Sequence, residues 1–219
     1  MKKNGLASFR MRNGFTLVEL LVVIAILSVA LTLVLTIFTR TLRGGNKSQV
    51  ISSIKQNGQA VLDLMDKTVR SSDRVVCTSD TGDTMVVVKN GLYTKYKFLP
   101  PTATENGYIQ QEEFNLPTEP GDRDESGYLR DFELGVCSDP FTNPQIITDT
   151  NAQSGASINC KAVSGTPNCL TNPIFVRTKQ AGFKDQITIQ FEIKSGVGAA
   201  QATAGTIDPV NFKTTIFIR

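Results

Sequence analysis

The longest hydrophobic run of the chain lies near its N-terminus, at residues 14–38. The 24 residues that follow Gly14 contain one charged side chain, Glu19. As a helix these residues span about 36 Å, which exceeds the ~30 Å hydrocarbon core of a bilayer. The run therefore predicts a membrane-spanning helix. An acidic side chain near the middle of the membrane costs about 2.5–3.5 kcal/mol. Glu19 lies nearer the end of the apolar run, so its cost is smaller, but its presence still needs a reason.

A second helical pattern covers residues 39–72. Polar side chains alternate there with apolar or small residues at three- and four-residue spacing, namely Val50, Ile51, Ile54, Gly58, Val61, Leu62, Met65 and Val69. This spacing predicts an amphipathic helix that packs one stripe onto the rest of the chain and ends near Ser71-Ser72. We expect any bend or melting of the long helix at Gly44-Gly45, because each glycine costs about 1 kcal/mol in a helix interior.

Residues 73–219 have the pattern of strands and turns. We expect strands at 74–78, 84–89, 92–99, 129–137, 174–178, 185–194 and 212–219, and one short strand within 108–120. Asn90-Gly91 is a two-residue hairpin signal. The last two strands alternate apolar and polar residues, which predicts an antiparallel pair with one face on the helix stripe. Residues 138–173 predict a long loop. The fold class is thus α+β, a long helix packed on an antiparallel sheet.

Charge is distributed unevenly along the chain. The net charge is +3, but residues 1–14 carry four basic side chains and no acid, so the remainder has a net charge of −1. Residues 40–74 carry seven basic and three acidic side chains, and residues 75–219 carry 12 basic and 16 acidic ones. The basic pI is therefore no evidence for nucleic-acid binding. The aromatic strand 92–99, with Tyr93, Tyr96 and Phe98 beside Lys95 and Lys97, could touch DNA, but an ordinary two-faced edge strand is the preferred interpretation.

All four cysteines follow the hydrophobic run, and the chain has no histidine. If the part of the chain that follows the hydrophobic run is exported as a folded head, its four thiols suggest two disulfides with three possible connectivities. We predict Cys160–Cys169, which closes a short loop in a segment poor in regular structure, and Cys77–Cys137 as the second pair. The absence of histidine and of any CxxC pair argues against a zinc module and against the commonest histidine-based catalytic designs. We expect no enzymatic activity and no catalytic residue.

An acidic segment at residues 122–133 resembles a calcium loop in its spacing. Oxygen-bearing residues and a glycine at the sixth position follow the pattern of an EF-hand loop, the ligand candidates being Asp122, Asp124, Ser126, Tyr128 and Glu133. Pro117 and Pro120-Gly121 forbid the entering helix of an EF-hand. A solvated acidic turn is therefore the main interpretation, and calcium is a possible rather than a required cofactor.

Three interpretations compete for the N-terminal run. A plain membrane anchor leaves Glu19 unexplained, and a cleaved secretory signal usually has an apolar region of only 7–15 residues. The third accounts for every feature. A basic leader, Gly14, Phe15, Thr16-Leu17-Val18, Glu19 and an apolar helix resemble the class III signal of type IV pilins and pseudopilins. The resemblance extends over about residues 2–74.

The resemblance implies a processing step and a set of partners. A prepilin peptidase cuts after the glycine, here Gly14, and methylates the new N-terminal Phe15, while Glu19 is retained for assembly. Residues 1–14 would be the leader, 15–38 the membrane and assembly half of the helix, 39–72 its amphipathic half and 73–219 the exported β-rich head. The partners would be the peptidase, other pilin or pseudopilin subunits, an inner-membrane assembly platform and membrane lipid.

The location follows from the same resemblance. Basic residues flank the apolar run on both sides, so charge alone only narrowly favours a cytoplasmic N-terminus. The resemblance implies a single pass through the bacterial cytoplasmic membrane, an exported head, and then a cell-surface or periplasmic filament. The large irregular head favours a minor subunit. The alternative is an anchored or secreted globular protein, with or without bound calcium, that enters no filament.

Overall fold

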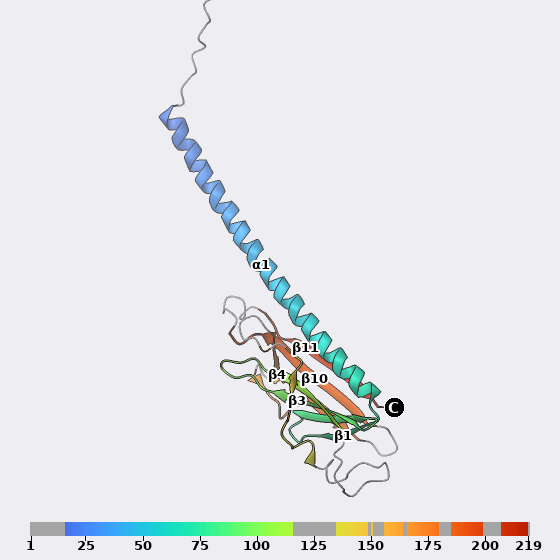
Figure 1. The fold of residues 1–219 in the computed structure, drawn as a ribbon. Coiled ribbons are helices and arrows are strands. Elements are labelled where there is room, and N and C mark those ends of the chain that lie inside the picture. Colours follow the sequence, from blue (N-terminus) through green and yellow to red (C-terminus); the bar gives the residue numbers. More distant parts are fainter. Residues whose placement is uncertain are drawn as a thin grey trace, which may run out of the picture. The chain divides into compact units, whose positions relative to one another are not determined.

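The computed structural model describes residues 16–115, 135–148, 150, 156–163, 166–179, 185–198 and 207–218 (Figure 1). These residues form one helix and eleven strands in the described ranges. The elements are α1 (Leu17–Ser71), β1 (Arg74–Thr78), β2 (Thr84–Lys89), β3 (Leu92–Leu99), β4 (Tyr108–Asn115), β5 (Gln145–Ile146), β6 (Ala156–Asn159), β7 (Ala162–Val163), β8 (Thr166–Pro167), β9 (Phe175–Thr178), β10 (Gln186–Ser195) and β11 (Val210–Phe217). The predicted α+β class is confirmed.

The helix α1 is continuous through Gly44-Gly45, so the melting expected there is wrong. The glycine penalty of about 1 kcal/mol each is small against the cooperativity of a long helix, in which each residue is fixed by the turns on both sides. The chain divides into two compact units, residues 1–46 and residues 47–219. The first contains the apolar half of α1, and the second contains the amphipathic half together with all the strands.

The strands form two main antiparallel sheets. The first sheet has the order β1-β2-β3-β4-β5. Its β2–β3 hairpin turns at Asn90 (φ 50°) and Gly91 (φ 81°), and two positive φ angles are what a tight I′ turn needs, so the predicted hairpin is confirmed. The second sheet has the order β11-β10-β6, with β9 also paired to β10, and β7 and β8 form a separate two-stranded ribbon.

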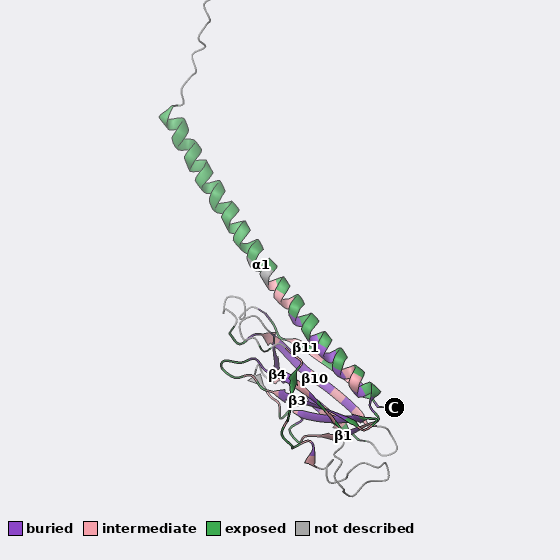
Figure 2. Ribbon diagram, in the orientation of Figure 1, coloured by how far each residue is buried: buried purple, intermediate pink, exposed green. Residues whose placement is uncertain are grey.

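The main core lies between α1 and these two sheets. The stripe predicted on the helix is buried, with Ile54, Val61, Leu62, Met65 and Val69 each at most 8% exposed. In Figure 2 the purple, buried positions of α1 lie on its strand-facing side together with pink, intermediate ones, and the other described positions of that helix are green. The alternating residues of β10 and β11 complete the core, namely Ile187, Ile189, Phe191, Ile193, Ile216 and Ile218. The predicted antiparallel β10–β11 pair is confirmed.

The first sheet is also covered on its outer face, which the sequence pattern did not indicate. Val86, Val88 and Tyr93 form a second small cluster with Val136. The strand expected at 129–137 falls partly outside the described residues. The strand prediction is wrong for residues 135–137, which are described. Gly135 begins a helical turn there, and its carbonyl accepts the N–H groups of Ser138 and Asp139. The long loop expected at 138–173 is interrupted by the short strands β5–β8.

Candidate functional site

The start of α1 is the first part of the predicted processing and assembly site that the structure describes. Gly14 and Phe15 lie outside the described residues. Thr16 precedes the helix, and its Oγ1 accepts the backbone N–H of Glu19 at 3.3 Å. A hydroxyl in this position satisfies one of the free N–H groups at a helix start. The signal was present in the sequence, since Thr-x-x-Glu is the capping-box pattern, but Thr16 was not predicted as a cap.

Glu19 lies in the first turn of α1 with an exposed side chain. A carboxylate there is favoured by the partial positive charge of the helix N-terminus, although this effect is far smaller than the cost of a fully unpaired charge in lipid. A positive group one helical turn before Glu19 would complete the compensation. The α-amino group of a chain beginning at Phe15 would stand four residues away, the spacing at which helix side chains are neighbours.

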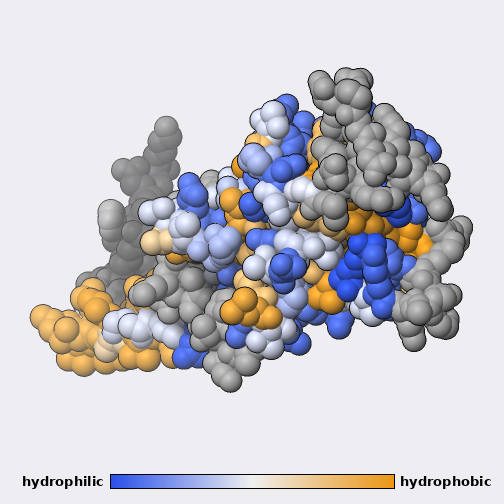
Figure 3. All heavy atoms as spheres, turned by 90° about the horizontal axis from the view of Figure 1, so that it is seen from below, coloured by the Kyte–Doolittle hydropathy of each residue, from blue (hydrophilic) through white to orange (hydrophobic). Residues whose placement is uncertain are grey.

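The apolar half of α1 is uncovered along its length. Its large hydrophobic side chains from Leu17 to Phe38 are 45–76% exposed. By length and composition α1 is the one helix of the described ranges that could cross a membrane, with a window of mean hydropathy 3.0 of which 0% is buried. In Figure 3 orange, hydrophobic residues gather at the lower left of the view, whereas the rest of the coloured surface mixes blue, white and orange residues. An uncovered apolar surface like that of α1 needs lipid or protein against it.

The few hydroxyl groups in this half are satisfied within the helix. Ser28, Thr32 and Thr36 donate to the carbonyl oxygens of Ala25, Val29 and Thr32 at 2.7–2.8 Å. Back-bonding of this kind removes the need for water or for a partner side chain. The segment therefore offers no unsatisfied hydroxyl to a membrane interior, and Glu19 is its one formal charge.

The cysteines form the two predicted pairs. Cys77 of β1 is bonded to Cys137, and Cys160 is bonded to Cys169. The first disulfide fastens the segment 135–143 to the outer face of the first sheet, and the second closes a loop around the β7–β8 ribbon. Because disulfides persist in oxidising compartments, both bonds are consistent with a head that leaves the cytoplasm.

Lys95 is buried rather than available to a ligand. Its side chain is on the outer face of β3, is 2% exposed, and donates from Nζ to the carbonyl oxygens of Val136 (2.7 Å) and Asp139 (2.6 Å). Burial lowers the pKa of Lys95, and the nearby Asp139 and Glu112 carboxylates oppose that change. Tyr93 and Tyr96 are also fully buried. The alternative of a DNA-touching strand is therefore wrong for these residues, because none of the three can contact a nucleic acid.

Glu112 holds the other end of the same segment. It lies opposite Lys95 on β4, and its Oε1 accepts the backbone N–H groups of Thr142 (2.9 Å) and Asn143 (2.7 Å). Phe141 lies over the Lys95 ammonium at 5.0 Å. Segment 135–143 is thus held by a disulfide, a buried ammonium and a buried carboxylate. Sequence reasoning missed both charged anchors, since each has the spacing of an ordinary solvated strand position.

The calcium candidates Asp122, Asp124, Ser126, Tyr128 and Glu133 all lie outside the described residues. Within the described ranges, no group of three or more His, Cys, Asp or Glu side chains is placed to hold a metal ion. The calcium hypothesis thus stays a prediction.

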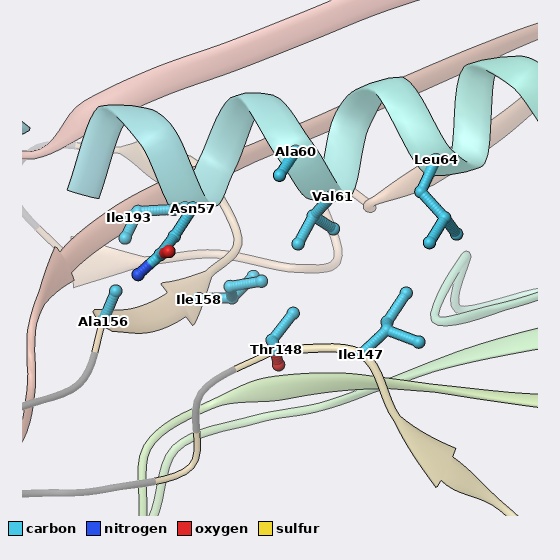
Figure 4. Close-up of a pocket in the computed structure, with 9 residues that line it drawn as sticks. All are labelled: Asn57, Ala60, Val61, Leu64, Ile147, Thr148, Ala156, Ile158 and Ile193. Carbon is cyan, nitrogen blue, oxygen red and sulfur yellow. The ribbon is translucent and has the colours of Figure 1, made fainter. Parts of the chain in front are cut away.

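A small apolar cavity lies between α1 and the head. It has a volume of about 180 Å³, and its lining includes Val61 and Leu64 of α1 and Ile147, Ile158 and Ile193 of the head. In Figure 4 these side chains converge on the space, and the two polar side chains at its edge, Asn57 and Thr148, lie on different sides. No charged residue lines it. Its chemistry is that of incomplete packing between helix and sheet, and it holds no catalytic group.

The comparison with protein families concerns the N-terminal region. Residues 9–35 match the family model described as the prokaryotic N-terminal methylation motif. No curated protein and no solved structure matches the chain. The matched residues include Gly14, Phe15 and Glu19 and most of the apolar half of α1. The chain therefore carries, over residues 9–35, the N-terminal methylation motif that is the signature of type IV pilins and pseudopilins.

Proposed function

We propose that the protein is a structural subunit of a type IV pilus or of a pseudopilus like that of type II secretion. The observation that carries this proposal is the uncovered apolar half of α1, most of which lies within the methylation motif and which is followed by a folded head. A filament subunit needs such a surface twice, first against lipid and then against the helices of neighbouring subunits.

Cleavage after Gly14 and methylation of Phe15 would precede assembly. The N-terminus would stay at the cytoplasmic face of the bacterial cytoplasmic membrane, and residues 73–219 would be exported. The two disulfides of the head support an oxidising destination. The proposed partners are prepilin peptidase, other pilin or pseudopilin subunits, the inner-membrane assembly platform and membrane lipid.

Glu19 would set the register of the packed helices. Its carboxylate is expensive in lipid unless it is paired, and the α-amino group of Phe15 can pair with it within one chain or from a neighbour. In a low dielectric an ion pair is favourable only with good geometry, so misaligned neighbours would leave a charge uncompensated. Leu, Val and Ile surfaces alone give no such preference, because they can slide past one another.

The substitution Glu19→Ala tests this mechanism. The variant should insert at least as well as the wild type and should still be cut after Gly14, but should enter filaments poorly. Glu19→Asp is the matched control, since it keeps the charge one methylene shorter and should assemble better than Glu19→Ala. Immunoblots of membrane and sheared-filament fractions measure all three steps. Normal assembly of Glu19→Ala would remove the register mechanism and leave the motif assignment standing.

The motif assignment itself is tested by Gly14→Val. The peptidase must accommodate the residue before the cut, so a branched side chain there should leave full-length precursor in the membrane. Normal-sized mature protein from this variant would contradict processing at Gly14. The other candidate, a globular protein that enters no filament, has no observation in its favour among the described residues.

A further inference from the structure

The outer edge of β11 has no paired strand in the part of the chain that the structure describes. Among the described strands β11 pairs only with β10. The N–H of Ile218 donates to the carbonyl of Asp185 at 3.1 Å, which fixes the alternation of the antiparallel ladder. Even-numbered residues of β11 therefore turn their N–H and C=O groups toward β10. Odd-numbered residues turn theirs outward, and these are Asn211, Lys213, Thr215 and Phe217.

The other edges of the two main sheets are short, irregular or covered in the described part of the chain. The edge strand β1 has a register shift between Val75 and Cys77, and the Val76 carbonyl accepts Nη1 of Arg177 at 3.0 Å. The edge strand β5 has two residues. The outer side of β6 is covered, since the N–H of Ile158 donates to the Gly107 carbonyl at 2.8 Å. Natural sheets protect their edges in these ways, and β11 has eight residues with no register shift.

A groove with two lysines runs between this edge and α1. It is lined by Lys55, Gln59 and Leu62 of α1 and by residues 210–213 of β11. Its described lining contains two basic residues, Lys55 and Lys213, and no acidic residue. Lys55 stands on the α1 side. The side chain of Lys213 lies on the opposite face of β11, because the neighbouring Phe212 points toward Gly58 of α1. Asp63, one turn beyond Gln59 on α1, accepts a hydrogen bond from Gln59 Nε2 at 2.8 Å. An extended chain beside β11 would thus meet free backbone groups and positive charge.

We propose that β11 accepts an extended, acidic segment of a partner protein as an added strand. The outward N–H and C=O groups of β11 supply main-chain hydrogen bonds, and Lys55 selects acidic side chains at the partner's alternate positions, those on the face of the added strand toward α1. Lys213 also disfavours a second copy of this chain, because an antiparallel register centred on it would place the two Lys213 side chains opposite each other. This inference does not depend on filament assembly.

Binding of a designed strand peptide to the purified full-length protein in detergent tests the proposal. The probe is a capped, labelled peptide as long as β11 that alternates glutamate with valine, and the control peptide has lysine in place of glutamate. Fluorescence anisotropy at low salt should show the glutamate peptide binding about tenfold more tightly, with the difference shrinking as salt screens the charges. Equal binding of the two peptides would contradict the assigned partner chemistry.

Two variants locate the binding. Lys213→Pro removes an outward N–H without removing a bond to β10, whereas Lys213→Ala removes the same charge and keeps that N–H. Lys213→Pro should bind the glutamate peptide about tenfold more weakly than Lys213→Ala. Lys55→Glu lies on α1, away from the ladder, and should reverse the preference between the two peptides. Equal binding by the two Lys213 variants, together with an unchanged preference in Lys55→Glu, would overturn the proposal.

The alternative occupant is a second copy of the chain. In that case the protein would show a concentration-dependent dimer by analytical ultracentrifugation, and Lys213→Pro would abolish it. This result would assign the β11 edge to self-association and would likewise overturn the acidic partner.

Discussion

Gly58 is a point of close contact between α1 and the second sheet, and adding one methyl group there tests the packing of the helix on that sheet. A Cβ at this position would stand 2.2 Å from Cζ of Phe212, and two further ring carbons lie within 2.7 Å. The ring cannot retreat freely, because it stacks on the buried ring of Phe191 with centroids 5.3 Å apart. Gly58→Ala therefore forces the helix or the ring pair to move by roughly 1 Å, an overpacking that costs about 1–3 kcal/mol in a filled core.

The magnitude is a balance of two terms. Overpacking a filled site costs about 1–3 kcal/mol, and a clash this close belongs at the upper end. Alanine returns about 1 kcal/mol through its better helix propensity. We therefore expect Gly58→Ala to lower the free energy of unfolding by about 1–2 kcal/mol, which is a fall in Tm of about 2–8 °C for a chain of this size.

Thermal unfolding of the full-length protein in detergent, followed by circular dichroism, measures the effect. Gly45→Ala in the same helix is the matched control, since nothing lies within 4 Å of its added Cβ, and it should not destabilise. In a Phe212→Ala background the clash is absent, so Gly58→Ala should become neutral or stabilising. A Gly58→Ala variant as stable as the wild type, or equally destabilised in both backgrounds, would refute the close packing of α1 on Phe212.

Four other outcomes can be measured, three that follow from described residues and one that tests the calcium hypothesis. Burial raises the pKa of Tyr96 to about 12, so the folded state keeps a proton that the unfolded chain loses near pH 10. Stability should therefore fall between pH 10 and 12, and Tyr96→Phe should reduce that fall in alkaline melts. Lys95→Met should destabilise the head by about 1–3 kcal/mol in urea titrations, because the carbonyls of Val136 and Asp139 lose a buried donor, and unchanged stability would contradict the anchoring role. Replacing both Cys77 and Cys137 by alanine should lower the free energy of unfolding by about 4 kcal/mol, because this disulfide closes the longer loop. Replacing both Cys160 and Cys169 should lower it by about 3 kcal/mol. If matched melts gave the reverse order, the loop-entropy explanation would be excluded. If residues 122–133 bind calcium, the protein should melt higher in millimolar calcium than in EDTA and Asp122→Ala should lose the shift, whereas an equal shift in that variant would remove the site.

The elements with local signals were the ones predicted well from the sequence. The bounds of β1, β2 and β3 agree with the structure, because the hairpin residues Asn90-Gly91 and the short apolar runs around them are specified within a few positions. The buried stripe of α1 and the alternation of β10 were likewise readable, since each periodicity depends on a single element packing against one face. The melting expected at Gly44-Gly45 was wrong because helix propensity is a property of single residues, whereas helix formation is cooperative along the chain.

The features that were missed depend on distant parts of the chain. Lys95 alternates along β3 as a solvated lysine would, and nothing near it indicates that a carbonyl 41 residues away comes to bond its ammonium group. The second sheet was missed for the same reason, because β6 pairs with β10 across a long separation. In the candidate site the motif positions Gly14, Phe15 and Glu19 were readable because their spacing is fixed in sequence. The open edge of β11 became visible only with the strand order.

Intact mass of the mature protein purified from its membrane tests the central claim most directly. A pilin-like precursor processed after Gly14 should give the mass of residues 15–219 with one added methyl group, less four hydrogens for the two disulfides. Fragmentation should place the methyl group on the amino group of Phe15. A chain that begins at Met1, or at Leu31 after a cut behind Ala30, would contradict processing at the methylation motif and with it the proposed route into a filament.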